Sequence, residues 1–527
     1  MAERYDAIVI GGGHNGLVNA AYLARAGRRV LLLEQRHLVG GASVSEEIYP
    51  GFNFSVFSYV VSLLRPEIIR ELDLPRHGLT ILPLESTLTP LPDGDLIYRG
   101  SDPHETFRNI GRFSPRDAEA YREYGHAMYQ MAKAVKYILG IRPPDLTSFH
   151  PRELIALRKL GRHFLGIEED HLYTLAKLMT MSSADFLEEW FEFDPLIATL
   201  SASGIIGTFL GPRSPGSAYV LLHHYMGEID GVFRAWGFQK GGTGGISQAI
   251  ASSAKELGAE IKTDSKVAKV LTKGQRAIGV ALENGSEYYA NIIVSSLDPK
   301  QTFLRLTDPD QLPDDLVRAV RNFETQGSSG KVNLALDAAP ELACWPGDGP
   351  HLRGAVSISP SVDYIERAYD QAKYGRFSED PYIDIILPSM IDPNMAPPGK
   401  HVMSCFVQYA PYHLKDGDWP TQREAFGDAV VNTLSEYIPN LKNIILHRQV
   451  LSPWDIEQTI GLSGGNIFQG ELSLSQLFFL RPASGYAQYR TPISGYYQCG
   501  SGTHPGGGIT GAPGRLAAIE ILKDGSR

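Results

Sequence analysis

Cysteine is scarce in this chain: its 527 residues include three, Cys344, Cys405 and Cys499. They are far apart in sequence and form no CxxC pair, which excludes a thioredoxin-like dithiol and a cysteine-based zinc site. The histidines show no metal-ligand spacing either, so we expect no metal site. We interpret the three cysteines as free thiols of a protein from a reducing compartment.

Excess positive charge and long apolar runs are also missing. The formal net charge is -10, which argues against a nucleic-acid-binding protein, because phosphate contacts need clustered lysine and arginine. No run reaches the roughly 18 apolar residues that a membrane-spanning helix requires. A strand-like pattern begins at Tyr5 and leaves no room for a signal peptide. We therefore expect a cytoplasmic protein; peripheral membrane contact and assembly into a homo-oligomer stay open.

The N-terminal residues predict a strand, a glycine-rich turn and a helix. Residues 5–10 are apolar and rich in β-branched side chains, as in a buried parallel strand. They lead directly into a G-x-G-x-x-G motif formed by Gly11, Gly13 and Gly16. The first glycine permits a tight turn, the second lets the backbone approach a pyrophosphate, and the third lets the helix pack closely. The helix over residues 17–26 offers free N–H groups to the phosphates.

An acidic residue completes this fingerprint. A second strand over residues 29–33 ends at Glu34, whose carboxylate can accept hydrogen bonds from ribose hydroxyls. A merely glycine-rich turn would not explain this carboxylate, so we predict that the segment binds a dinucleotide. Gly40 and Gly41 follow shortly afterwards. They form either an ordinary surface turn or a second contact with the cofactor.

The C-terminal region contains a second strand, glycine loop and helix. Residues 496–499 predict a strand, residues 500–508 form a glycine-rich loop, and a helix begins near Thr510. The N-terminus of this helix can face an anion or a carbonyl. In flavoenzymes of this construction, such a helix lies near the pyrimidine edge of the flavin and stabilises the negative charge of the reduced ring. We therefore predict that this loop contacts a flavin.

Both ends of the chain resemble the phytoene desaturase-like FAD-dependent oxidoreductases. The resemblance is carried by VIGGGHNGL at residues 9–17, by the ExxxxxGG extension that starts at Glu34, and by GSGTHPGGGITGAPGR at residues 500–515. The chain is similar in particular to the carotenoid ketolase and pyridine nucleotide-disulphide oxidoreductase domain 2 branches, although it has no redox CxxC. The resemblance implies FAD and an α/β fold, in which a Rossmann-type FAD-binding domain of the amine oxidase kind is interleaved with a mixed α+β substrate domain.

The predicted domains alternate along the chain. We assign residues 1–100, 236–298 and 474–527 to the FAD-binding domain, and residues 101–235 and 299–473 to the substrate-binding domain. The first substrate segment has a mainly helical pattern, and the second has a mixed, strand-rich one. No second Rossmann motif for NAD(P)H is apparent, so electrons would enter from an organic substrate or from a nicotinamide that docks transiently.

The predicted FAD contacts come from three parts of the chain. The N-terminal fingerprint and its extension hold the ADP half, and the C-terminal loop faces the ring. The resemblance implies that a strand beginning at Val267 contacts the adenine through its backbone. The residues implied are Gly11, Gly13, His14, Asn15, Gly16, Glu34, Gln35, Gly40, Gly41, Val267, Gly500, Gly502, Thr503, Gly508, Ile509 and Thr510.

Few side chains are candidates for catalysis. His504 is the only titratable side chain in the flavin loop; it either acts in catalysis or holds the loop backbone. Arg481, Tyr486 and Arg490 precede the loop and are candidates for the substrate entrance, with a structural role as the alternative. Asn466 has the same two alternatives, and the resembling family often has a histidine there, which weakens a proton-transfer role.

These features predict an FAD-dependent oxidoreductase. The preferred reaction is a two-electron oxidation, a desaturation or a related step, of a lipophilic isoprenoid or carotenoid substrate. Positioning in a water-excluded apolar tunnel is sufficient for a hydrocarbon, so a base need not exist. The alternatives are oxidation of an amine or another small organic molecule, and a flavin-carrying interaction protein whose FAD is structural.

Overall fold

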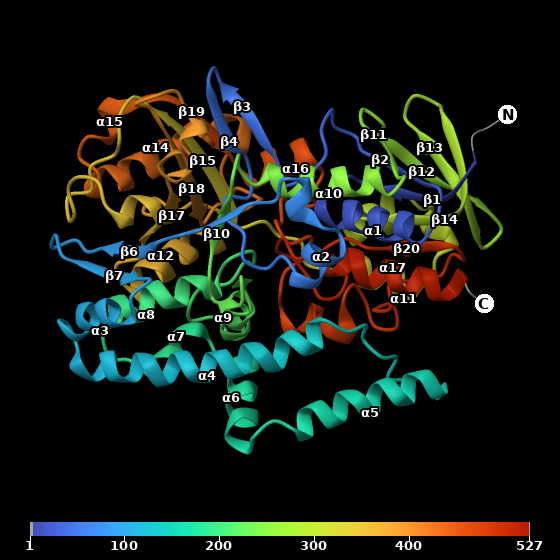
Figure 1. Cartoon of the computed structure of the whole chain (residues 1–527), viewed down its shortest axis with the longest axis horizontal. Coiled ribbons are helices and arrows are strands. Elements are labelled where there is room, and N and C mark those ends of the chain that lie inside the picture. Colours follow the sequence, from blue (N-terminus) through green and yellow to red (C-terminus); the bar gives the residue numbers. More distant parts are fainter. Residues whose placement is uncertain (1–3, 526–527) are drawn as a thin grey trace.

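The computed structural model describes residues 4–525 of the chain. Two large sheets organise this part of the molecule, one on the right and one on the left of Figure 1, with a layer of helices below. The chain passes repeatedly between them, so each sheet is assembled from segments distant in sequence. Within residues 4–525, no helix is both long and apolar enough to cross a membrane.

The first sheet contains the strand, turn and helix predicted at the N-terminus. Its order is β11-β2-β1-β14-β13-β12, with β20 beside β14. Ala7 and Val9 of β1 pack toward α1, α10 and α17, whereas Ile8 and Ile10 face the opposite layer, as the alternation of a strand requires. The elements are β1 (Arg4–Ile10), β2 (Val30–Leu33), β11 (Glu260–Lys262), β12 (Val267–Lys273), β13 (Arg276–Leu282), β14 (Glu287–Ser295), β20 (Tyr496–Gln498), α1 (His14–Arg25), α10 (Gly244–Glu256), α11 (Asp314–Arg321) and α17 (Ala512–Gly525).

The second sheet forms the core of the part that the sequence predicts to bind the substrate. Its order is β19-β15-β18-β17-β16-β6-β7, and every residue of β15 is buried. Cys405 lies in this core, and Cys344, Cys405 and Cys499 are free thiols. The elements are β6 (Ser86–Pro90), β7 (Leu96–Gly100), β15 (Ser329–Leu336), β16 (Ala355–Ile358), β17 (Tyr382–Ile386), β18 (His401–Gln408), β19 (Ile445–Leu451), α12 (Val362–Lys373), α13 (Pro388–Ile391), α14 (Trp419–Tyr437), α15 (Leu441–Ile444) and α16 (Pro453–Ile460).

A layer of helices lies below the sheets in Figure 1. The long helix α4 begins with a serine cap: the side chain of Ser114 accepts a hydrogen bond from the amide of Asp117 at 3.1 Å. The helix α5 lies apart from the sheets, along the lower edge of the figure. The helices are α3 (Pro103–Gly111), α4 (Pro115–Leu139), α5 (Pro151–Leu165), α6 (Glu169–Thr180), α7 (Ser183–Glu188), α8 (Asp194–Ser201) and α9 (Ser217–Tyr225).

The sheet pairing differs from the predicted division of the chain at one point. The predicted FAD-binding domain extends to residue 100, but β6 pairs with β16 and β7 pairs with β6, so both belong to the second sheet. No local pattern reveals a partner so distant in sequence. The other domain bounds stay a prediction. The described part of the chain also contains two-stranded sheets and a short helix: β3 (Ser45–Tyr49) with β4 (Phe52–Ser55), β5 (Ile81–Pro83) with β10 (Gly237–Gln239), β8 (Glu228–Ile229) with β9 (Val232–Phe233), and α2 (Pro66–Glu71).

Candidate functional site

The turn between β1 and α1 is shaped by close contacts at two glycines. Gly11 has a φ of 93°, and a Cβ there would lie 2.5 Å from Oγ of Ser296. A Cβ on Gly16 would lie 2.1 Å from the carbonyl oxygen of Gly11, so α1 can approach the strand this closely only with glycine at this position. A Cβ on Gly13 would meet nothing within 4 Å, because this residue faces a cavity.

The second glycine pair packs directly on this turn. The amide of Gly40 donates a hydrogen bond to the carbonyl of Gly12 at 2.8 Å. A Cβ on Gly41, whose φ is 59°, would lie 3.3 Å from Cα of Gly13. Gly40 and Gly41 therefore belong to the same site as the first motif. An ordinary surface turn would not make these contacts.

Glu34 ends β2 beside the glycine turn. One of its carboxylate oxygens accepts from the amide of Gly12 at 2.6 Å, and the other accepts from the amide of Arg36 at 2.9 Å. A carboxylate has about four acceptor positions, so capacity remains for ribose hydroxyls. Burial raises the pKa of Glu34 above its ordinary value, and these two backbone donors act in the opposite direction.

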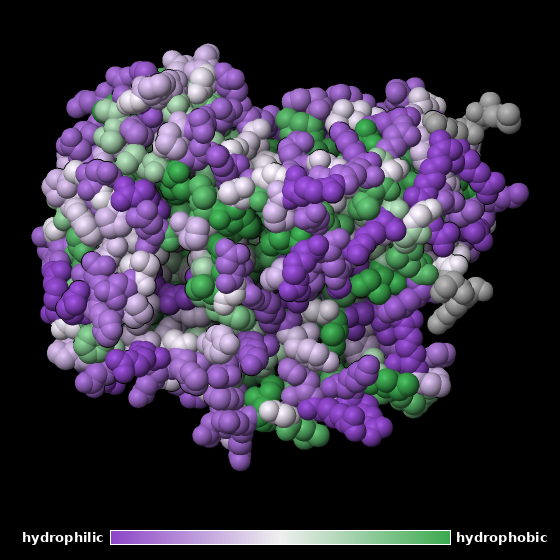
Figure 2. Space-filling view, viewed as in Figure 1, coloured by the Kyte–Doolittle hydropathy of each residue, from purple (hydrophilic) through white to green (hydrophobic). Residues whose placement is uncertain are grey.

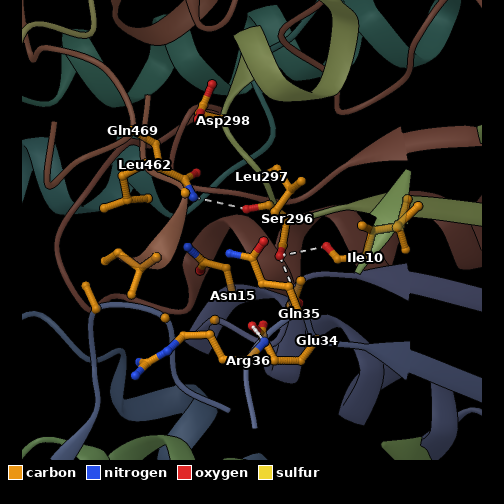
Figure 3. Close-up of a pocket in the computed structure, with 18 of the residues that line it drawn as sticks. Ile10, Asn15, Glu34, Gln35, Arg36, Ser296, Leu297, Asp298, Leu462 and Gln469 are labelled. Carbon is orange, nitrogen blue, oxygen red and sulfur yellow. Dashed lines mark hydrogen bonds between the residues drawn. The ribbon is translucent and has the colours of Figure 1, made fainter. Parts of the chain in front are cut away.

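A cavity of about 970 Å³, called here the first cavity, lies over the carboxyl ends of β1 and β2 (Figure 3). Glu34 and Arg36 lie at its lower edge in the figure, and Asp298 and Gln469 at its upper edge. Parallel sheets bind ligands at this edge. The predicted FAD contacts that line it are Gly11, Gly13, His14, Asn15, Gly16, Glu34, Gln35, Gly40, Gly41 and Val267.

Polar atoms in this lining fit the ADP half of a dinucleotide. Nε2 of His14, Oδ1 of Asn15 and Nη1 of Arg36 are buried and have no hydrogen-bond partner within residues 4–525. Buried polar atoms in folded proteins almost always have partners, and hydroxyls and phosphates would supply them here. The first cavity therefore has the glycine turn, the carboxylate and the free polar groups that an adenine dinucleotide requires.

The C-terminal loop closes against the N-terminal motif. Nδ2 of Asn15 donates to Oγ of Ser501 at 2.9 Å, and Nδ2 of Asn19 donates to the carbonyl of Gly514 at 3.0 Å. The helices α1 and α17 therefore pack side by side, and a Cβ on Gly514 would lie 2.3 Å from the carbonyl oxygen of Asn15. The two flavin motifs form one continuous site.

A second cavity of about 970 Å³ adjoins the first, and His14, Ala42 and Ile467 line both. Among the described residues that line it, none is acidic. Of the predicted loop contacts, Gly508 and Ile509 line this second cavity, whereas Gly500, Gly502, Thr503 and Thr510 do not. Its large apolar and aromatic lining residues include Phe57, Tyr59, Ile206, Trp236, Phe406 and Phe468.

Lys331 of β15 also lines the second cavity, and the sequence analysis missed it. Its Nζ donates to Oδ1 of Asn333 at 2.9 Å and to Oγ of Ser404, and it lies 5.4 Å from the ring centroid of Tyr59. Burial lowers the pKa of Lys331 to about 7. One signal was visible in the sequence: a lysine within an otherwise strand-like, mostly apolar stretch at residues 329–336.

The histidines of the second cavity are neutral at physiological pH. Burial lowers the pKa of His14 to about 4 and the pKa of His224 to about 4. Nδ1 of His224 lies 2.8 Å from the carbonyl oxygen of Val220, one turn earlier in α9. Lys331 is therefore the group in this cavity whose protonation changes near pH 7.

Arg481 and Asn466 are buried behind the C-terminal loop, and His504 is buried within the loop itself. Arg481 donates to backbone carbonyls, including that of Ser501 at 2.9 Å, and Nδ2 of Asn466 donates to the carbonyl of Gln326 at 3.1 Å. His504 is absent from the described lining of both cavities, and burial lowers its pKa to about 3. These contacts favour the structural alternative for Arg481 and Asn466. The roles of all three residues in catalysis or substrate binding stay a prediction.

Tyr486 and Arg490 also lie outside the described lining of both cavities. Arg490 forms ion pairs with Asp524 at 2.7 Å and with Glu520 at 3.1 Å. Tyr486 packs beside the apolar cluster of the first sheet. Both residues stand close to the flavin loop in sequence, but neither lines a cavity described above, and a role at the substrate entrance stays a prediction.

Comparison with known proteins decides the family. Residues 16–522 match the family described as flavin containing amine oxidoreductase. The chain belongs to this family. It is 40% identical to pyridine nucleotide-disulfide oxidoreductase domain-containing protein 2 of Rattus norvegicus, over 99% of this chain and 94% of that protein. It is 28% identical to the phytoene desaturase (lycopene-forming) of a Paracoccus species, over 97% of this chain and 96% of the relative.

The fold is shared with solved structures of the same kind. A putrescine oxidase superimposes with a TM-score of 0.61 over 99% of both chains, at 16% sequence identity. These findings confirm the predicted resemblance, the fold class and FAD as the cofactor, and the chain is an FAD-dependent oxidoreductase. The first cavity would hold the ADP half of FAD, and the junction of the two cavities would hold the flavin ring. When bound, FAD supplies a two-electron acceptor.

Proposed function

We propose that this enzyme catalyses a two-electron oxidation, a desaturation or a related step, of a lipophilic isoprenoid or carotenoid substrate. The lining of the second cavity carries the proposal: it is mainly apolar and aromatic and, among the described residues, contains no carboxylate. A hydrocarbon loses no hydrogen bonds in such a cavity, whereas an ammonium ion would lose its hydration without gaining a counter-charge. The phytoene desaturase among the relatives is named for a substrate of this kind.

Different residues of the second cavity have different roles in such a reaction. Desaturation removes a hydride from one carbon and a proton from its neighbour, and a bound flavin would supply the acceptor for the hydride. Ile206 and Phe406 position the hydrocarbon and exclude water. Lys331, whose pKa burial lowers to about 7, is neutral in a large fraction of molecules at that pH and can accept the proton at Nζ.

Oxidation of an amine is the second candidate. The rings of Tyr59 and Phe406 stack at 5.8 Å in the second cavity, and aromatic faces attract cationic groups. The family is also named for amine oxidoreductases. The charged form of Lys331 opposes this candidate, because it would repel an ammonium substrate below about pH 7.

Anaerobic visible spectroscopy of the purified yellow protein separates the candidates. Phytoene in detergent, a panel of amines, and NAD(P)H are added separately, and bleaching of the flavin band is followed. Bleaching by phytoene alone supports the proposal, and bleaching by amines alone overturns it in favour of the second candidate. If none of these compounds reduces the flavin, the dehydrogenase proposal fails and a structural flavin gains support.

A pair of tryptophan variants tests whether the second cavity holds the substrate. Ile206→Trp fills the cavity and is expected to slow bleaching by the substrate at least about tenfold, with the FAD content unchanged. Leu446→Trp adds the same ring at a side chain that is 39% exposed, and it should bleach like the wild type. Equal rates for the two variants would place substrate binding elsewhere.

A further inference from the structure

The helix α5 presents large apolar side chains to solvent. Leu154, Ile155 and Leu165 are 47%, 56% and 87% exposed, and Phe149, just before the helix, is 88% exposed. Figure 2 shows hydrophobic residues at the lower edge of the molecule, where α5 lies in Figure 1. A monomeric protein rarely gathers exposed apolar groups on one surface without a partner for them.

Basic side chains share this exposed face. Arg158, Lys159 and Arg162 are exposed, and within the described part of the chain none of them forms an ion pair. The acidic residue of the helix, Glu153, is buried and pairs with Arg142 at 2.6 Å. The solvent face of α5 is therefore cationic, although the chain as a whole has a net charge of -10.

The opposite face of α5 holds the helix on the body of the protein. Nη2 of Arg152 lies 2.6 Å from the carboxylate of Glu520 in α17. The ring of His163 stacks on Tyr137 of α4 at 4.3 Å, and its Nε2 lies 2.9 Å from the carbonyl oxygen of Ala134. The exposed face therefore belongs to a helix that these contacts hold on the body of the protein.

We propose that the exposed face of α5, formed by Leu154, Ile155, Arg158, Arg162 and Leu165, docks the protein on an anionic lipid surface. Apolar side chains can enter the boundary between head groups and acyl chains while the cations contact the phosphates. A second copy of the chain would bring the same positive charges together, which disfavours self-association through this face.

The position of α4 connects this surface with the interior. Tyr137 of α4 contacts α5, while Lys136 and Leu139 line a small cavity that shares Ser62 and Leu63 with the second cavity. Docking through α5 would hold this side of the enzyme close to the bilayer. Lipid binding itself does not depend on the proposed substrate, so its test remains independent of the proposed function.

Vesicle flotation with the FAD-loaded protein tests the proposal. The probes are vesicles of phosphatidylcholine alone and of phosphatidylcholine mixed with phosphatidylglycerol. We expect binding to the mixed vesicles that weakens with added salt. The triple variant Arg158→Glu, Lys159→Glu, Arg162→Glu and the triple variant Leu154→Ser, Ile155→Ser, Leu165→Ser should each reduce binding at least about tenfold.

Matched controls lie elsewhere on the surface. Arg122→Glu on α4 and Tyr374→Ser, whose side chain is 74% exposed, should bind vesicles like the wild type. Equal FAD content and melting temperature show that each variant is folded. Absence of wild-type binding to both kinds of vesicle, or unchanged binding of both triple variants, would overturn the proposal. A dimer that the serine variant dissociates, without vesicle binding, would identify a second copy as the occupant and equally overturn it.

Discussion

The side-chain amide of Asn15 donates to the hydroxyl of Ser501 at 2.9 Å, which joins residues from the two ends of the chain. Both residues line the first cavity. Within residues 4–525, Oδ1 of Asn15 has no hydrogen-bond partner. The contact with Ser501 therefore orients the amide and leaves its oxygen for a donor on the cofactor.

A double-mutant cycle measures this contact. Asn15→Ala and Ser501→Ala should each weaken FAD binding. The loss of binding free energy in the double variant should be smaller than the sum of the losses in the two single variants. We expect a coupling free energy of about 0.5 to 1.5 kcal/mol, the range of a single hydrogen bond. The measurement is the dissociation constant of FAD, followed by the fluorescence of released cofactor. Strictly additive losses would show that the two side chains act separately.

Gly16→Ala should abolish stable FAD binding. The new Cβ would lie 2.1 Å from the carbonyl oxygen of Gly11, so α1 must move away from the glycine turn and its N-terminus loses its place beside the pyrophosphate. The flavin absorbance per mole of protein checks this. Gly125→Ala on α4 is the control, since its Cβ would meet nothing within 4 Å, and it should retain FAD with slightly raised stability.

Lys331→Met should change how stability depends on pH. In the unfolded chain the pKa of lysine is near 10.5, whereas burial lowers the pKa of Lys331 to about 7 in the folded protein. Between these values the unfolded state binds more protons, so this group makes the free energy of unfolding rise as the pH increases from about 7 to about 10. The total rise from this one site is on the order of 4 kcal/mol.

Urea denaturation across that pH range measures the effect. The difference in unfolding free energy between Lys331→Met and the wild type should favour the variant most near pH 7 and shrink as the pH rises. Lys269→Met, on an exposed side chain of β12, is the matched control and should follow the wild type. A parallel pH dependence of wild type and Lys331→Met would show that the amine is not buried as described.

Arg481→Met should destabilise the loops whose carbonyls Arg481 holds together. The guanidinium is fully buried and donates to the carbonyls of Ser501, Glu471 and Gly470 at 2.9 to 3.0 Å. Methionine leaves these carbonyls without donors, so the free energy of unfolding should fall by at least about 3 kcal/mol. Arg116→Met, at an exposed ion pair with Glu192, should cost no more than about 1 kcal/mol.

Thermal denaturation and FAD retention measured together check this role of Arg481. Arg481→Lys keeps the charge but presents fewer donors. Its melting temperature and its FAD retention should therefore lie between those of the wild type and those of Arg481→Met. If Arg481→Met melts like the wild type and only substrate oxidation is lost, the residue acts on the substrate and the structural role is wrong.

Local sequence patterns determined the cofactor, the family and the start of the main elements. The glycine spacing from Gly11 to Gly16 and the acidic residue Glu34 predict the glycine turn and the carboxylate beside it. This is possible because a turn, a helix and two adjacent strands are formed by residues that are close in sequence. The cap at Ser114 and the turn at Asn284 and Gly285, which joins β13 to β14, are likewise formed by residues that are neighbours in sequence.

Only the tertiary structure decided which distant side chains share a cavity. Lys331 contacts the second cavity because β15 pairs with β18 and β19 and lies fully buried between them, and no spacing in the sequence encodes that neighbourhood. Arg490 stands close to the flavin loop in sequence, yet it pairs with Asp524 on another side of the fold. A binding motif made of neighbouring residues can be recognised in the sequence. The second cavity, in contrast, forms from strands and loops that meet only when the chain packs its core.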